Sequence, residues 1–103
     1  MTTTPKKVKS VPYEQELYKD LRNNPDDAIE YLSASLEDPN SPELFLIALR
    51  HIAEAWGFGH LAEITGLNRE SLYKMLSENG NPKLSSLILL LDGMGLRLAV
   101  VKK

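Results

Sequence analysis

The sequence predicts a mainly α fold, with five helices followed by one short C-terminal β-strand. Apolar residues recur at spacings of three and four along most of residues 25–94, which is the period of helices that bury one face. Asn-Pro, Ser-Pro and Gly positions separate these stretches, as they do at helix starts and ends. Residues 96–101 instead alternate and are rich in strand-forming side chains, which indicates a strand.

The N-terminal part is predicted to precede these helices as a separate segment. Residues 1–12 carry three lysines and no acid, and we expect a flexible basic tail there. Residues 13–21 are amphipathic and fit either a helix or a strand. Residues 13–103 are expected to form a single helical domain, because a chain of 103 residues suffices for one domain with a modest core.

The first of the five helices is predicted to begin at Asn24 and to end before Asp38-Pro39-Asn40. Asn24 is placed as an N-cap, Pro25 occupies the first helical position, and two acids follow at the positive helix end. The apolar residues expected to line one face of this helix are Ala28, Ile29, Leu32 and Leu36.

The second helix, residues 43–56, is predicted to start in the same way, at Ser41-Pro42-Glu43. It is apolar over most of its circumference and has only a narrow polar side. We expect such a helix in the middle of a bundle, or partly in a subunit interface. Gly57-Phe58-Gly59 ends it.

The third and fourth helices form the most informative part of the chain, residues 60–87. Leu61, Ala62 and Ile64 predict a short helix, and Gly66 suits the left-handed position that ends it. Asn68 is placed as the N-cap of the next helix. There the apolar residues Leu72, Met75 and Leu76 are expected to share one face. Two short helices around a tight turn predict a DNA-reading helix-turn-helix, although a plain helical hairpin has the same spacing.

The opposite face of the fourth helix carries side chains that suit DNA. Arg69 and Lys74 can reach guanine edges or phosphates, and Asn68 or Ser71 can bond bases or phosphates. Glu70 can accept from cytosine or simply repel phosphate. Tyr73 lies on this face as well.

Residues 77–83 form a polar loop before the fifth helix, residues 84–94, which ends at Gly95. Phosphate can be bound by the backbone amides of this loop and by Asn81 and Lys83. The loop is equally consistent with a mere connector between two helices. The strand at 96–101 must pair with an N-terminal segment or with the same strand of a second chain, because a lone strand is not stable.

Composition excludes several classes of protein. Without cysteine there are no disulfides, thiolate zinc sites or cysteine nucleophiles, which suits a reducing cytoplasm. No apolar run is long enough to span a membrane, and the first ten residues lack the apolar core of a secretory signal. His51 and Glu54 lie one helical turn apart but have no evident third ligand or nucleophile. We therefore expect no enzyme, metal or cofactor.

The net charge of −2 is unevenly distributed along the chain. Residues 1–12 carry +3, residues 13–56 carry ten acids and three bases, and residues 57–103 carry six bases and four acids. The acidic half is therefore expected to face away from DNA. The weak positive charge of the other half predicts modest affinity per monomer and reliance on a dimer.

The string AEITGLNRESLYKMLSENGNPKLSSL, followed by GMGLRL, resembles the addiction-module antidote proteins, antitoxins with an Xre/Cro-type helix-turn-helix. The resemblance covers about residues 25–101. It implies a five-helix Xre/Cro-like domain, a dimeric repressor that binds its own operator as double-stranded DNA, and a cognate small basic toxin of the RelE/ParE-like class.

Carried onto this chain, the resemblance assigns residues 68–77 to the recognition helix. It also implies that His60 contacts DNA at the start of the first motif helix, although the family usually carries Ser-Gln where this chain has Gly59-His60. The residues expected to bind DNA are thus His60, Asn68, Arg69, Glu70, Ser71, Tyr73, Lys74, Asn79, Asn81 and Lys83.

The sequence therefore predicts the antitoxin of a type II toxin-antitoxin module, which represses its own operator and neutralises its toxin. Two alternatives remain open at this point: a helical protein-interaction module, and a stand-alone transcriptional regulator without a toxin.

Overall fold

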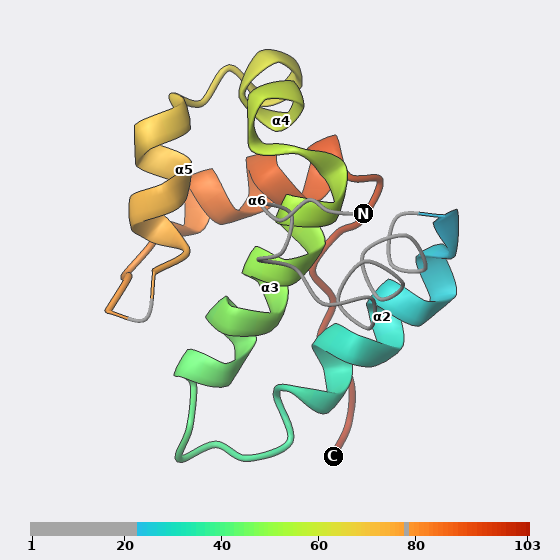
Figure 1. Ribbon diagram of the computed structural model, residues 1–103. Coiled ribbons are helices and arrows are strands. Elements are labelled where there is room, and N and C mark those ends of the chain that lie inside the picture. Colours follow the sequence, from blue (N-terminus) through green and yellow to red (C-terminus); the bar gives the residue numbers. More distant parts are fainter. Residues whose placement is uncertain (1–22, 78) are drawn as a thin grey trace, which may run out of the picture.

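The computed structural model describes residues 23–77 and 79–103, and these residues form five helices (Figure 1). The predicted basic tail, residues 1–12, and the amphipathic segment, residues 13–21, lie outside the described residues. The five helices are α2 (Pro25–Ala34), α3 (Glu43–Trp56), α4 (Phe58–Thr65), α5 (Arg69–Met75) and α6 (Leu84–Gly93).

Helix α4 is the hub of the described fold. It packs against α3, α5 and α6, while α2 packs against α3 (Figure 1). Its two buried residues, Phe58 and Leu61, have 4% and 0% of their surface exposed. The sequence placed the long apolar helix α3 at the centre, yet the short helix between Gly57 and Gly66 contacts more neighbours.

Helix α2 begins as predicted but ends earlier. Pro25 occupies its first turn with two acids, whereas the Asn24 side chain makes no capping hydrogen bond. The helix ends at Ala34 rather than beside Asp38. Ala28 is buried, but Ile29 and Leu36 are 48% and 58% exposed. Among the described helices α2 packs only against α3, which leaves these two apolar side chains largely in solvent.

Helix α3 has the predicted bounds, Glu43–Trp56. Its N-cap is Pro42, one residue later than Ser41, and no side chain caps it. Ala48, Leu49, Ile52 and Ala53 are buried, so the face toward α2 and α4 is continuous and apolar. The described residues have no buried polar or charged side chain, which leaves burial of apolar surface as the main stabilising term.

Close contact between α4 and α6 depends on Gly93. A Cβ atom at this position would lie 2.8 Å from Cγ2 of Thr65, closer than two carbons approach without a shift. Ile64 lies beside the same glycine, yet 47% of its surface is exposed. Ile64 therefore lies at the edge of the α4–α6 contact, whereas Leu61 is fully buried.

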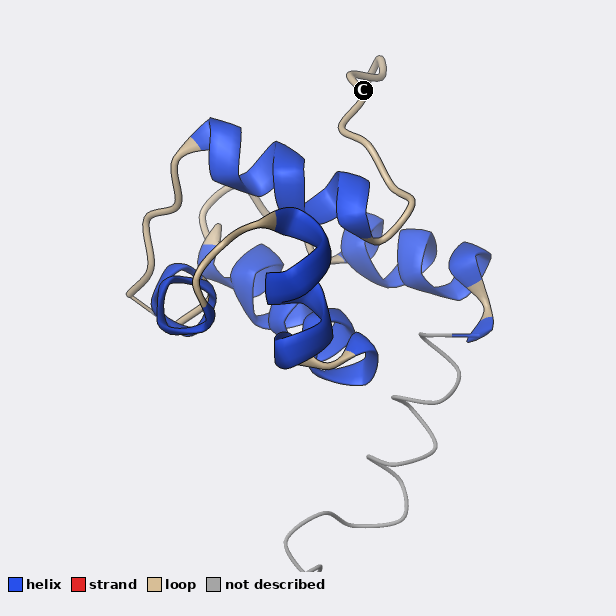
Figure 2. Cartoon of the chain, turned by 90° about the horizontal axis from the view of Figure 1, so that it is seen from above, coloured by secondary structure: helices blue, strands red, loops and turns tan. Residues whose placement is uncertain are grey.

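The predicted strand at residues 96–101 is not formed. The chain turns at Gly95, which has a φ of 77°, and Leu96 N–H donates to the Leu91 carbonyl. The residues that follow form a loop leading away from the helices (Figure 2), and the described part of the chain contains no strand. An edge without a partner gains no ladder hydrogen bonds, which explains why alternation alone did not produce a strand.

Candidate nucleic-acid interface

The turn between α4 and α5 is fixed by the side chain of Thr65. Its hydroxyl donates to the Leu61 carbonyl at 2.6 Å and accepts from Leu67 N–H at 3.1 Å. Gly66 follows with a φ of 78°, the left-handed conformation predicted from the sequence. One threonine and one glycine thus end α4 and turn the chain toward α5.

Asn68 caps α5, as predicted. Its Oδ1 accepts from Glu70 N–H at 2.7 Å and from Ser71 N–H at 3.2 Å. These bonds satisfy two of the amide groups that the first turn of a helix leaves without partners. The helix then runs over Arg69–Met75, slightly shorter than the predicted 68–77.

The inner face of α5 is apolar and buried. Leu72, Met75 and Leu76 have at most 9% of their surface exposed. They hold the helix against α4, which confirms the face predicted from their spacing. Because the inner face is fixed in this way, the outer face is determined too.

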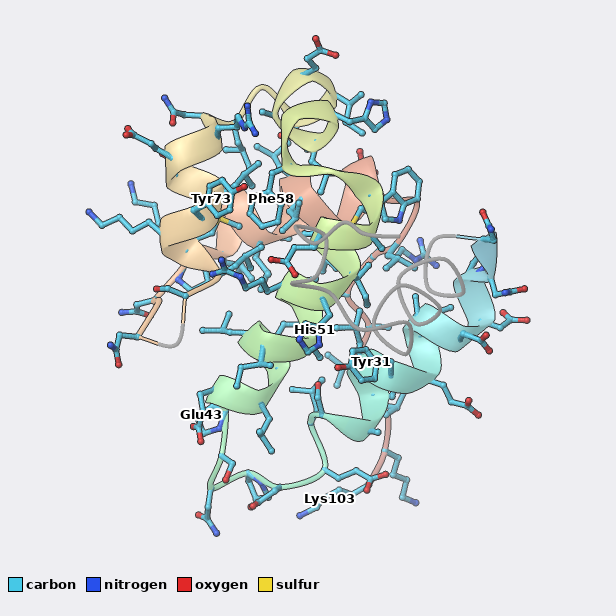
Figure 3. The ribbon with its side chains drawn as sticks, in the orientation of Figure 1. Tyr31, Glu43, His51, Phe58, Tyr73 and Lys103 are labelled. Carbon is cyan, nitrogen blue, oxygen red and sulfur yellow. The ribbon has the colours of Figure 1, made fainter. Side chains whose placement is uncertain are left out.

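The outer face of α5 presents six of the predicted side chains to solvent (Figure 3). All six are exposed, and they lie within one short helix and its cap: Asn68, Arg69, Glu70, Ser71, Tyr73 and Lys74. Two cations, one carboxylate and several hydrogen-bonding groups therefore lie together. Such side chains suit hydrogen bonds to the phosphates and base edges of DNA.

His60 lies apart from this face, in the first turn of α4. It is exposed, and its ring lies parallel to the Trp56 ring at 6.3 Å between centroids and 7° between planes. The predicted site therefore includes a second element at the start of α4.

Tyr73 is less free than its exposure suggests. Its ring stacks on Phe58 of α4 at 4.2 Å between centroids (Figure 3), and the Arg50 guanidinium of α3 lies 5.6 Å from its centroid. This contact joins α3, α4 and α5, and sequence reasoning missed both Phe58 and Arg50. Tyr73 itself was the only signal, since an aromatic residue on a polar helix face commonly packs its ring on a neighbour.

The loop after α5 places Asn79, Asn81 and Lys83 in solvent. Gly80 N–H donates to the Ser77 carbonyl at 2.8 Å, and a Cβ atom at Gly80 would collide with the Met75 carbonyl oxygen. Only glycine therefore allows the chain to fold back so tightly beneath α5. Lys83 occupies the N-cap position of α6. The predicted DNA-binding residues thus lie on three successive parts of the chain: the start of α4, helix α5 and this loop.

Other kinds of site find little support in the described residues. Tyr31 Oη and His51 Nδ1 form a hydrogen bond of 2.6 Å between α2 and α3 (Figure 3). Residues 23–77 and 79–103 contain no group of three or more His, Cys, Asp or Glu arranged to hold a metal ion. Within the same ranges no helix has the length and apolar character needed to cross a membrane.

Comparison with known proteins identifies the family. Residues 14–102 match the family described as "Probable addiction module antidote protein". The chain belongs to this family. A relative from Haemophilus influenzae, described as an uncharacterized protein, is 37% identical over 70 residues, covering 68% of this chain and 71% of the relative. No solved structure matches the chain. This match confirms the predicted membership of the antidote family.

Proposed function

We propose that this chain is the antitoxin of a type II toxin-antitoxin module, which binds its own operator as a repressor and neutralises a cognate small basic toxin of the RelE/ParE-like class. The observation that carries the DNA part is helix α5. It is held rigidly by a side-chain-capped turn and a buried apolar face, and it exposes Arg69, Glu70, Tyr73 and Lys74. The α4–α5 unit acts as an Xre/Cro-type helix-turn-helix, with α5 entering the major groove.

Charge determines how this surface binds. Residues 60–87 carry three bases and three acids, so bulk attraction to phosphate is small. Binding then depends on specific side chains, on the shape of the turn and on a second subunit that presents a second α5 to an adjacent half-site. Asn79, Asn81 and Lys83 supply backbone contacts from the loop, and His60 supplies another from α4.

The DNA hypothesis is tested by Arg69→Ala combined with Lys74→Ala. Removing both cations from α5 is expected to abolish a gel shift on the chain's own promoter while the fold persists. The matched control is Arg97→Ala with Lys102→Ala, which removes the same charge from exposed residues of the C-terminal loop. If the α5 variant shifts the promoter as well as the control does, the DNA reading is wrong.

Acidic side chains on α2 support a separate surface for the toxin. Asp26, Asp27 and Glu30 are exposed, and residues 13–56 carry ten acids against three bases. A basic partner is attracted to such an acidic surface. Complementary charge across an interface speeds the encounter of the two proteins and disfavours wrong partners.

The toxin hypothesis is tested by reversing Asp26, Asp27 and Glu30 to lysine. Co-purification with the toxin encoded beside this chain is expected to be lost. Reversal of Glu63, Glu70 and Asp92, also exposed but on α4, α5 and α6, changes the net charge equally and is expected to leave toxin binding intact. If the α2 variant binds the toxin as well as the wild type does, α2 is not the toxin-binding surface.

A homodimer is the third part of the proposal. Helix α6 exposes Leu84, Ile88 and Leu89, by 63%, 48% and 46%, and the C-terminal loop adds Leu98 and Val100. These exposed apolar side chains suit a second copy of the chain better than a basic toxin. In such a dimer, residues 96–101 of the two copies can pair with each other as strands.

Two alternatives differ from this proposal in measurable ways. A pure protein-interaction module binds toxin but not promoter DNA. A stand-alone regulator binds promoter DNA and lacks a basic chain of domain size in the neighbouring reading frame.

A further inference from the structure

Arg50 of α3 extends the cationic flank of α5. Its guanidinium lies 5.6 Å from the centroid of the Tyr73 ring, and its Nε is 3.4 Å from Oε2 of Glu54, one turn along α3. Both side chains of this ion pair are about one-third exposed, at 36% and 34%. Arg50 is therefore at the surface beside a residue of the candidate interface, although it belongs to a different helix.

Three residues line this flank. Arg69 and Tyr73 lie four positions apart on α5 and so share a face. The Arg69 guanidinium is close to Gly59 of α4, since a Cβ there would lie 3.9 Å from Arg69 Cζ. Tyr73 stacks on Phe58, one residue before Gly59, and Arg50 lies over the same tyrosine ring. Arg50 of α3 thus lies over the Tyr73 ring, and Arg69 of α5 lies one helical turn from that tyrosine on the same helix.

The ion pair leaves Arg50 able to bind a second anion. A guanidinium has five N–H donors, and only Nε is engaged by Glu54 in the described contacts. The remaining donors form a planar fork that matches two phosphate oxygens. An exposed pair between residues four apart on one helix is weak, so phosphate can replace the carboxylate.

We propose that Arg50 is a phosphate-binding residue of the DNA interface and that Glu54 competes with DNA phosphate for it. The inference rests on the proposed DNA binding by α5. It adds a contact from α3 to an interface whose own motif carries no net charge. It also gives Glu54 a role, because a carboxylate that holds Arg50 lowers the affinity of the free protein for any DNA and makes binding depend more on the specific contacts of α5.

The test measures affinity for a duplex from the chain's own promoter at several salt concentrations. Affinity falls as salt rises, and loss of one phosphate contact makes the plot of log affinity against log salt shallower, its steepness falling by about 0.9. Arg50→Gln is expected to reduce the steepness by about this amount and the affinity severalfold. Arg97→Gln, which removes the same charge from the C-terminal loop, is expected to leave the slope unchanged. Arg50→Lys, which keeps the charge, is expected to retain most of the slope.

The competition is tested by Glu54→Gln, which is expected to tighten binding about threefold or more. Glu43→Gln is the matched control, since Glu43 is exposed at the far end of the same helix (Figure 3). The gain from Glu54→Gln must disappear in the Arg50→Gln background, because no guanidinium is left to release. If Glu54→Gln still raises the affinity in the Arg50→Gln background, the gain comes from lost repulsion between Glu54 and DNA phosphate. That result overturns the proposed competition.

The outcomes separate this inference from the proposed function. If the wild-type chain does not bind the promoter duplex, the proposed function and the inference both fail. If it binds and Arg50→Gln has the wild-type slope, only the inference fails. Thermal unfolding of each variant shows whether a change in affinity comes from a change in the fold.

Discussion

Helices α5 and α6 both pack against α4, yet they present opposite surfaces to solvent. Helix α5 buries Leu72 and Met75 and exposes charged and hydrogen-bonding groups. Helix α6 buries Leu90 and Leu91 and exposes further leucine and isoleucine side chains. Polar and apolar surfaces suit different partners, so under the proposed function α5 contacts nucleic acid while α6 contacts protein.

The two helices are also attached to α4 in different ways. Helix α5 is positioned by hydrogen bonds from Thr65 and Asn68 and by the ring of Tyr73 on Phe58. Helix α6 is positioned by the absence of a side chain at Gly93. Directional contacts thus fix the orientation of α5, whereas close packing fixes that of α6.

The largest effect is expected where α6 touches α4. Gly93→Ala places a methyl group 2.8 Å from Thr65 Cγ2, and overpacking of this kind typically costs about 1–3 kcal/mol. We expect the free energy of unfolding in urea to fall by this amount, although alanine is the better helix former by up to about 1 kcal/mol.

Thr65→Ser is the companion change, because it removes Cγ2 and keeps the hydroxyl that ends α4. In that background Gly93→Ala is expected to be neutral or stabilising. An equal loss in both backgrounds would contradict the steric account of Gly93.

A smaller effect is expected at the cap of α5. Asn68→Ala removes both capping bonds, and loss of such a cap costs about 1 kcal/mol. Asn24→Ala is the matched control, since Asn24 occupies the same position on α2 but makes no side-chain cap bond. Urea unfolding is expected to detect the first change and barely the second; equal losses would show that the cap bonds contribute nothing.

The smallest effect on monomer stability is expected on the outer face of α6. Ile88→Gln with Leu89→Gln changes exposed residues, which usually alters the free energy of unfolding by no more than about 0.5 kcal/mol. Under the proposed homodimer, sedimentation is nonetheless expected to show weaker association of the double variant. Adding the deletion of residues 96–103 is expected to weaken association further, and a double variant that stays fully dimeric would place the interface elsewhere.

Local rules predicted much of the α4–α5 unit. Gly66, the Asn68 cap and the buried face of α5 all follow from spacing and from the chemistry of single residues. The bounds of α3 follow from Pro42 and Gly57 in the same way. These features depend only on residues within one or two turns of the chain.

Features that depend on distant contacts were missed or wrong. Nothing local shows that Thr65 would meet Gly93, or that Arg50 would lie over Tyr73. The exposure of Ile29 and Leu36 could not be predicted, because a helical period identifies an apolar face but not whether a neighbour covers it. The strand at 96–101 failed for the related reason that alternation does not supply a pairing partner.

Helix α5 is so short that it depends on the packed core for its existence. A helix of seven residues is far below the roughly 12–15 residues at which isolated helices become even marginally stable in water. It exists only while its buried face is packed, so its amide hydrogens are expected to exchange together with those of the core. Under the proposed function, operator DNA binds the packed state alone and thereby slows opening of the chain. A protease that captures the opened chain would then free the operator without touching a single DNA contact.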